Sequence, residues 1–159
     1  MKGRSQSSLI QTKPSEVKAV RIRRARLQDA SRLAELSGQL GYPASRAEIV
    51  QRMKRMRPVA HAIFVAETGK NVIGWLHASV TPLLELALCA EVNGLVVDEN
   101  QRSLGAGAQL LDAAERWAAK KGCNSMSVRS NVIRERAHAF YLRQGYEHYK
   151  TQKAFRKNL

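Results

Sequence analysis

The chain has 159 residues, the length of one ordinary domain with room for a substantial hydrophobic core. Hydrophobic residues make up 44% of it, yet no apolar run approaches the roughly 18 residues that a membrane span needs. Its two cysteines, Cys89 and Cys123, are too few for a disulfide framework. Since the N-terminus also lacks a secretory signal pattern, these features predict a cytoplasmic protein with no membrane partner.

The net charge of +14 is unusual, and half of it lies at one end of the chain. Residues 1–26 contain eight Lys or Arg against a single Glu. Such an excess favours anionic partners, which include nucleic acid, acidic protein surfaces and polyphosphate cofactors, or it only keeps the protein in solution. Residues 1–18 are polar without apolar periodicity, so they predict a mobile basic tail before one domain over residues 19–159.

The first half of this domain shows one strand, two helices and a hairpin. Val20 and Ile22 alternate with arginines, as in a strand with one buried face. Ser45 and Glu48 are spaced as a capping box, which starts a helix that Pro58 ends. The Thr-Gly-Lys turn between two β-favouring runs indicates a hairpin. The predicted elements are a strand at 19–26, helices at 29–39 and from 45 onward, and strands at 61–67 and 71–80.

The second half alternates strands and helices around one long amphipathic segment. Asp112 and Arg116 lie four residues apart on its polar side, and Gly122 ends it. Its apolar side consists of Leu110, Leu111, Ala114, Trp117 and Ala118. The predicted elements are strands at 89–97, 125–130, 146–151 and 154–157, and helices at 105–121 and 134–144. The whole pattern predicts one mixed α/β domain.

The most informative stretch joins the strand at 89–97 to the helix that follows. The sequence RSLGAG at 102–107 lies between them. The first amides of a helix lack internal partners and lie at the positive end of its dipole. Glycines there let a diphosphate approach the backbone, and Arg102 adds a positive charge. The alternative is an ordinary strand-to-helix turn, while the dinucleotide and triphosphate glycine motifs are both absent.

Two landmarks in this order resemble the GNAT superfamily of N-acetyltransferases. RSLGAG resembles its R/Q-x-x-G-x-G/A signature, and NVIRERAHAFYLRQGY at 131–146 resembles its second landmark. The resemblance spans about residues 21–157. It departs from many relatives at Ser103, where they have Gly, and at Glu99, near which they have Pro. It implies a mixed, mostly antiparallel sheet of six to seven strands flanked by about four helices, and direct acetyl transfer from acetyl-coenzyme A to a primary amine without a metal.

The resemblance also implies how the cosubstrate is held. Its pantetheine arm is expected to lie along the strand at 94–97, whose amides polarise the acetyl carbonyl. Gly94 within a β-favouring run indicates a bulge or a close backbone approach that frees such an amide, or is a glycine that a strand merely tolerates. The expected contacts are Leu95, Val96, Val97, Arg102, Ser103, Leu104, Gly105, Ala106, Gly107, Ala108, Asn131, Arg134, Ala137 and Tyr141.

Two side chains are predicted to handle protons. Glu91 is the first candidate for the general base, because it lies eleven residues before Arg102, as in the histone-acetylating branch. By strict alternation it shares a face with Asn93 and Leu95, unless a bulge shifts the register. Its alternative is a surface or ion-paired glutamate, and the fallback bases are His77 and Glu85. Tyr141 resembles the tyrosine that protonates the leaving thiolate in many relatives, and its alternative is a packing aromatic.

The acceptor is predicted from charge alone. Five basic side chains surround Glu48 in the region that usually forms the acceptor surface of this family, namely Arg46, Arg52, Lys54, Arg55 and Arg57. They would repel polyamines and aminoglycosides, so an acidic peptide, a protein N-terminus in an acidic context or a small amino acid-like amine is expected.

Two other functions stay open. The first is a GNAT-like fold that binds acetyl-coenzyme A as a regulator without turnover. The second is a basic nucleic-acid-binding domain, but no RNP-like, KH-like or helix-turn-helix signature is present, so nucleic acid is not expected as a partner. Because relatives often pair, a homodimer is an expectation.

Overall fold

The computed structural model describes residues 19–102 and 104–159, so the predicted basic tail and Ser103 lie outside the described residues. A five-stranded sheet in the order β1-β2-β3-β4-β5 forms the centre. Neighbouring strands are antiparallel except β4 and β5, which are parallel. The strands are β1 (Val20–Arg24), β2 (His61–Thr68), β3 (Asn71–Val80), β4 (Cys89–Val97) and β5 (Ser125–Val128).

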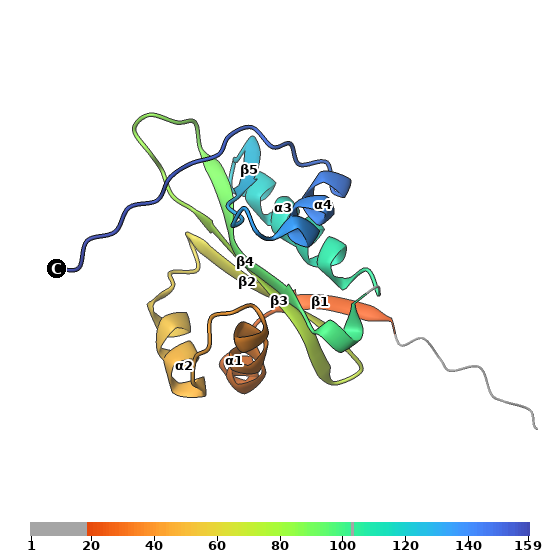
Figure 1. Ribbon diagram of the computed structural model, residues 1–159. Coiled ribbons are helices and arrows are strands. Elements are labelled where there is room, and N and C mark those ends of the chain that lie inside the picture. Colours follow the sequence, from red (N-terminus) through yellow and green to blue (C-terminus); the bar gives the residue numbers. More distant parts are fainter. Residues whose placement is uncertain (1–18, 103) are drawn as a thin grey trace, which may run out of the picture.

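Helices cover both faces of this sheet (Figure 1). The pair α1 (Ala30–Gln39) and α2 (Arg46–Arg55) lies on one face. The pair α3 (Ala106–Lys120) and α4 (Glu135–Arg143) lies on the other. The short helices η1 (Leu27–Asp29) and η2 (Glu99–Gln101) precede α1 and α3. This architecture confirms the predicted mixed α/β fold, and within the described residues no helix has the length and apolarity to cross a membrane.

Each face of the sheet has its own hydrophobic cluster. On the α3 side, Leu110 and Leu111 pack with Leu76 of β3, and all three are at most 1% exposed. On the α1 side, Leu33 and Leu36 pack against Val65 of β2. A strand alternates its side chains between faces, so the central strands supply apolar residues to both clusters.

Local sequence signals account for the turns and helix ends. The Ser45 hydroxyl accepts from the Glu48 backbone N–H, and the Glu48 carboxylate accepts from the Ser45 N–H at 2.8 Å. This is the predicted capping box of α2. The hairpin between β2 and β3 closes on the pair Thr68–Asn71, and Gly69 has a φ of +60°, a conformation that favours glycine.

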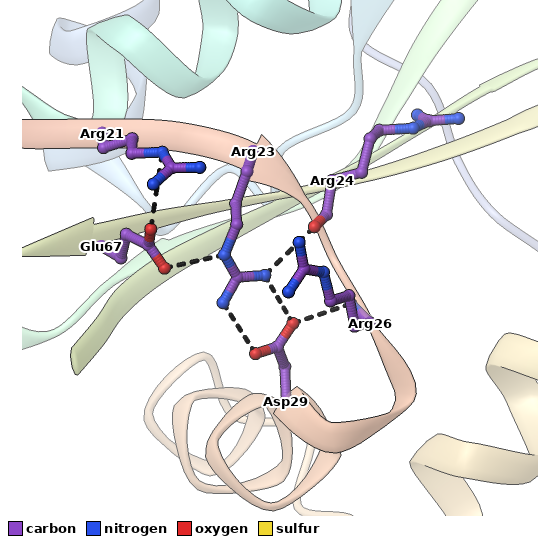
Figure 2. A network of polar contacts seen from close by, with 6 residues as sticks. All are labelled: Arg21, Arg23, Arg24, Arg26, Asp29 and Glu67. Atoms are coloured by element: carbon purple, nitrogen blue, oxygen red, sulfur yellow. Dashed lines mark hydrogen bonds and ion pairs between the residues drawn. The ribbon is translucent and has the colours of Figure 1, made fainter. Parts of the chain in front are cut away.

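A network of polar contacts fastens β1 to β2 and to the start of α1 (Figure 2). Arg23 Nε donates to Glu67 at 2.7 Å, and its terminal nitrogens donate to both oxygens of Asp29 at 2.8 and 2.9 Å. The Arg26 backbone N–H also donates to Asp29. The three charged side chains are at most 15% exposed, so each depends on the others for its hydrogen bonds. The hydrogen bond from Arg23 is the main reason that the pKa of Asp29 is lowered.

The predicted strands at 146–151 and 154–157 are wrong, and the sheet has five strands rather than six to seven. After α4 the chain runs extended and pairs with no strand of the described sheet, as the blue segment of Figure 1 shows. Residues 147–159 are exposed throughout. The local pattern was β-like, but a strand forms only where a partner completes its backbone hydrogen bonds.

Candidate active site

The downstream half of β4 has an open edge toward β5. The four residues from Cys89 to Val92 pair with β5, whereas the pairing ends there and the last residues of β4 keep only β3 as a partner. Backbone donors and acceptors at 93–97 are therefore available to a molecule lying between the two diverging strands. An extended arm with amide groups fits such an edge as an additional strand would.

A bulge lies at the point where the two strands part. In the β3–β4 register His77 faces Gly94 and Ala78 faces Val92, so Asn93 is the extra residue. The predicted bulge is confirmed, one residue before Gly94. Gly94 itself lies against a side chain, because a Cβ there would lie 2.9 Å from the Trp75 ring. The bulge also breaks the predicted shared face. Leu95 packs on the α3 side, while Asn93 lines the α1 side.

The N-terminus of α3 is open to solvent. Gly105 is exposed and has a φ of +74°, and no side chain caps the first amides of the helix. Arg102 and Leu104 are exposed beside it. Gly107 also lies close to a side chain, since a Cβ there would lie 3.4 Å from the ring of Phe140. This corner can accept a diphosphate on its backbone amides.

The side chains predicted from the second landmark gather near α4. Tyr141 packs on the α3 cluster against Phe140 and Tyr146, and burial raises the pKa of its phenol to about 12 despite the opposing charge of Arg134. Arg134 donates to the Leu40 carbonyl at 2.7 Å, which ties α4 to the end of α1. Asn131 is exposed, and its Oδ1 accepts from the Ile133 N–H at 3.2 Å. Ala137 is half-buried in the first turn of α4.

A cavity of about 320 Å³ lies on the opposite face of the sheet, between α1, α2 and the bulge. Its wall is mainly apolar, and Arg52 is its one charged group among the described residues. The other polar groups in the wall include Tyr42, His77 and Asn93. Asn93 is held in place by a 2.8 Å hydrogen bond from its Nδ2 to the Ser79 hydroxyl. The bulge thus contributes to both the cavity and the open edge of β4.

The predicted bases occupy three different environments. Glu91 is ion-paired with Arg129 at 2.5 Å and does not line the cavity. Glu85 is exposed in the connection between β3 and β4. His77 does line the cavity. The structure therefore brings His77 and Asn93 to the cavity wall, and leaves Glu91 outside that wall.

Sequence reasoning missed the pairing of His61 with His77. Nδ1 of His61 and Nε2 of His77 lie 3.1 Å apart, and the two rings stack with centroids separated by 5.3 Å. The short turn at 69–70 would by itself set His77 opposite Ala62, on the other face. The register shift between Ala66 and Glu67 instead sets it opposite Ile63, two residues from His61 on the same face, so no local signal could have found the pair. Trp75, whose indole nitrogen is buried without a hydrogen-bond partner among the described residues, was likewise missed as a wall residue.

Comparison with known proteins supports this geometry. The profile of the Acetyltransferase (GNAT) family matches residues 27–146. The chain is 31% identical over 122 residues to the aminoalkylphosphonate N-acetyltransferase of Salmonella typhimurium, covering 75% of this chain and 77% of that protein. It is 29% identical over 109 residues to an aminoglycoside N(6')-acetyltransferase of Klebsiella aerogenes, covering 67% and 71%.

A solved structure agrees at the level of the fold. An aminoglycoside N-acetyltransferase in complex with CoA matches with a TM-score of 0.81 at 19% identity, over 92% of this chain and 99% of that one. The chain belongs to the GNAT family of acetyltransferases. It is an acetyl-coenzyme A-dependent N-acetyltransferase, as the two sequence landmarks predicted.

Proposed function

We propose that this enzyme transfers the acetyl group to a small primary amine that has an apolar body and an anionic substituent. The observation that carries the proposal is the cavity beside the β4 bulge, which combines an apolar wall with Arg52 and with no carboxylate among the described residues lining it. An ammonium-rich acceptor would find no counter-ion in this wall. A carboxylate or phosphonate would pair with the Arg52 guanidinium, whose own ion pair with Glu48 is long, at 3.6 Å, and about half exposed.

The cosubstrate supplies the acetyl group as a thioester. In our proposal the α3 amides at 105–108 hold its diphosphate, and the open edge at 94–97 holds its pantetheine arm. Arg102, Asn131, Ala137 and Arg134 complete this seat, the last through the N–H groups that Leu40 does not use. Ser103 and the contact expected of it lie outside the described residues.

Two parts of this seat, a backbone segment and one side chain, act on the charge that develops during transfer. Backbone N–H groups in the 94–97 segment donate toward the acetyl carbonyl, where negative charge grows as the amine attacks. Tyr141 keeps its proton at neutral pH, because its pKa is raised to about 12, so its phenol can donate to the departing sulfur. Glu91 stays the sequence-based prediction for the general base. Its carboxylate is not part of the cavity wall, so it would act through a water.

The relatives bear on the acceptor in opposite ways. One is named for aminoalkylphosphonates, small amines with an anionic group, and this is the chemistry that Arg52 favours. The other is named for aminoglycosides, which are polycations. The absence of a carboxylate among the described wall residues supports the first class for this chain, in agreement with the charge-based expectation.

The acceptor proposal is tested with pairs of amines that differ only by an anionic group, such as phenylalanine with phenethylamine. We expect kcat/KM to be higher for the anionic member, and Arg52→Met to lower it about tenfold for that member alone. Arg55→Met, on the same helix but outside the cavity wall, is the matched control. The proposal fails if the best acceptors are polycations, or if Arg52→Met weakens both members of a pair equally.

Binding of the cosubstrate is measured separately, by thermal shift. Acetyl-coenzyme A at one hundred times its dissociation constant should stabilise the fold by about 2.7 kcal/mol. An unchanged melting temperature would contradict the cosubstrate seat itself, whatever the acceptor. A raised melting temperature with no turnover on any amine would instead favour the regulator that the sequence left open.

A further inference from the structure

A pair of histidines forms part of the wall of the acceptor cavity. His77 lies in β3 opposite Gly94, next to the bulge, and it lines the cavity together with Trp75 and Asn93. Its Nε2 is 3.1 Å from Nδ1 of His61 at the start of β2, and the rings are inclined by 30°. Within the described part of the chain, the one hydrogen bond of the His77 ring is at Nε2, so Nδ1 is available to a bound molecule.

No other group in the described wall is suited to accept a proton at neutral pH. The other titratable or charged wall residues are Tyr42, from the connection between α1 and α2, and Arg52 of α2. A phenol and a guanidinium are proton donors at neutral pH. Glu91 is held by Arg129 outside the wall, and Glu85 is exposed. Among the described wall residues, the imidazole is the one group that can both take up and release a proton near neutral pH.

The histidine pair also allows one ring to receive a proton without keeping a positive charge. Burial, and secondarily the charge of His61, lowers the pKa of His77 to about 4. His77 is therefore neutral at pH 7 and is a poor place for a lasting positive charge. Because Nε2 of His77 is hydrogen-bonded to His61, His77 can release a proton from Nε2 while it accepts another at Nδ1.

We propose that His77 accepts the proton of the acceptor amine and that His61 relays it out of the cavity, an inference that rests on the proposed acceptor site. As the C–N bond forms and the C–S bond breaks, the proton on nitrogen moves to Nδ1 of His77. The proton on Nε2 of His77 moves to Nδ1 of His61, and a proton leaves His61 for water. The departing sulfur takes its own proton from Tyr141 or solvent. Exchange with water restores the starting tautomers.

This route and the predicted role of Glu91 are alternatives that kinetics distinguish. In the full chain, with the best amine from the paired panel, we expect His77→Gln to lower kcat about 100-fold and His61→Gln about tenfold. The loss in His77→Gln should exceed that in Glu91→Gln. His148→Gln, at an exposed histidine bonded to Thr151, should leave kcat unchanged. The inflection of the kcat–pH profile should move in His61→Gln, which a purely structural role would not cause.

Binding and spectroscopy keep the test independent of turnover. Each variant should retain the thermal shift with acetyl-coenzyme A, which shows that the fold and the cosubstrate seat are intact. Nitrogen NMR of the histidine-labelled wild-type chain should find the proton of neutral His77 on Nε2 and none on Nδ1 of His61. The opposite tautomers would overturn the relay, as would a smaller kcat loss in His77→Gln than in Glu91→Gln. Failure of every amine with these tautomers present would count against the proposed acceptor, not against the imidazole pair.

Discussion

The two faces of the sheet at β4 differ in what builds them. On the α3 side, the centre of the proposed cosubstrate seat is made of backbone groups, namely the open edge at 93–97 and the exposed amides that follow Gly105. On the α1 side, the cavity consists of side chains from α1, α2, β2, β3 and β4. A seat made of backbone needs only a particular chain conformation, whereas a seat made of side chains depends on which residues meet there.

The two relatives carry names of different acceptors although both are named acetyltransferases. Changing the wall of a side-chain cavity changes what fits it, while the backbone of β4 and α3 stays as it is. Four sets of substitutions test whether the two faces of the sheet act independently.

The largest effect is expected on the α1 side and concerns stability. Asp29→Asn removes the charge that faces the nearly buried Arg23 and should lower the free energy of unfolding on the order of 3 kcal/mol. Asp112→Asn breaks an exposed pair with Arg116 and should change it by less than about 1 kcal/mol. Urea unfolding measures both. Equal losses of unfolding free energy in the two variants would show that the network of Figure 2 stabilises the fold no more than an exposed ion pair does.

The same network predicts a pH dependence. The folded-state pKa of Asp29 lies below its ordinary value of 3.8, so its contribution is complete above that value and is lost as the pH falls through the lowered pKa. Asp29→Asn should therefore be less sensitive than the wild type to acid below this range. Unfolding curves that converge as the pH falls are the expected outcome.

The second effect concerns the cosubstrate seat. Gly105→Val forces a β-branched residue into a positive φ at the start of α3 and should weaken acetyl-coenzyme A binding about 100-fold, as measured by calorimetry. Gly122→Val introduces the same strain at a φ of +83°, where a Cβ meets nothing within 4 Å. It should lower stability but not affinity, and equal affinities in the two variants would contradict the α3 seat.

The third effect concerns the predicted acid. Tyr141→Phe removes a phenol that stays protonated at neutral pH and should lower kcat about 30-fold, with the affinity for acetyl-coenzyme A retained. Tyr146→Phe removes a neighbouring hydroxyl that donates to Glu115 at 2.9 Å, and kcat should change by less than about threefold. If Tyr141→Phe keeps full kcat, the residue is a packing aromatic, the alternative that the sequence left open.

The smallest effect compares two glycines that face opposite sides. In Gly94→Ala the new methyl group would displace the Trp75 ring and should raise the KM for the acceptor about fivefold. In Gly107→Ala it presses on Phe140 and should weaken acetyl-coenzyme A binding by a similar factor of about five. Steady-state kinetics and calorimetry give both constants for each variant. If each variant changes both the acceptor KM and the affinity for acetyl-coenzyme A, the two faces are coupled through β4.

Much of the cosubstrate side could be predicted because its signals are local. The strand at 89–97 was predicted with its observed bounds, and the helix after it was predicted at 105–121 and observed at Ala106–Lys120. The irregularity at Gly94 was predicted as well, although its effect on the face of Leu95 needed the β3 register. The roles of Glu91 and Tyr141 stay predictions, since contacts place these side chains but do not show a proton moving.

For the acceptor side, the sequence predicted only an excess of positive charge. Of the five basic side chains on which that expectation rested, only Arg52 lines the cavity. The histidine pair arises from two strands whose register a turn and a bulge decide. Contacts of this kind depend on long-range geometry, and no short sequence pattern predicts them.

The amino-acid sequence was sufficient for the class of fold, the helix and turn ends and the glycine-rich corner before α3, since each depends on residues within a few positions of one another. Tertiary structure alone decided that 146–159 forms no strand, that β4 parts from β5 at Asn93, and that His61 meets His77. The physical reason is that backbone pairing and cavity walls require partners, and a chain position does not specify its partner until the strands are in register.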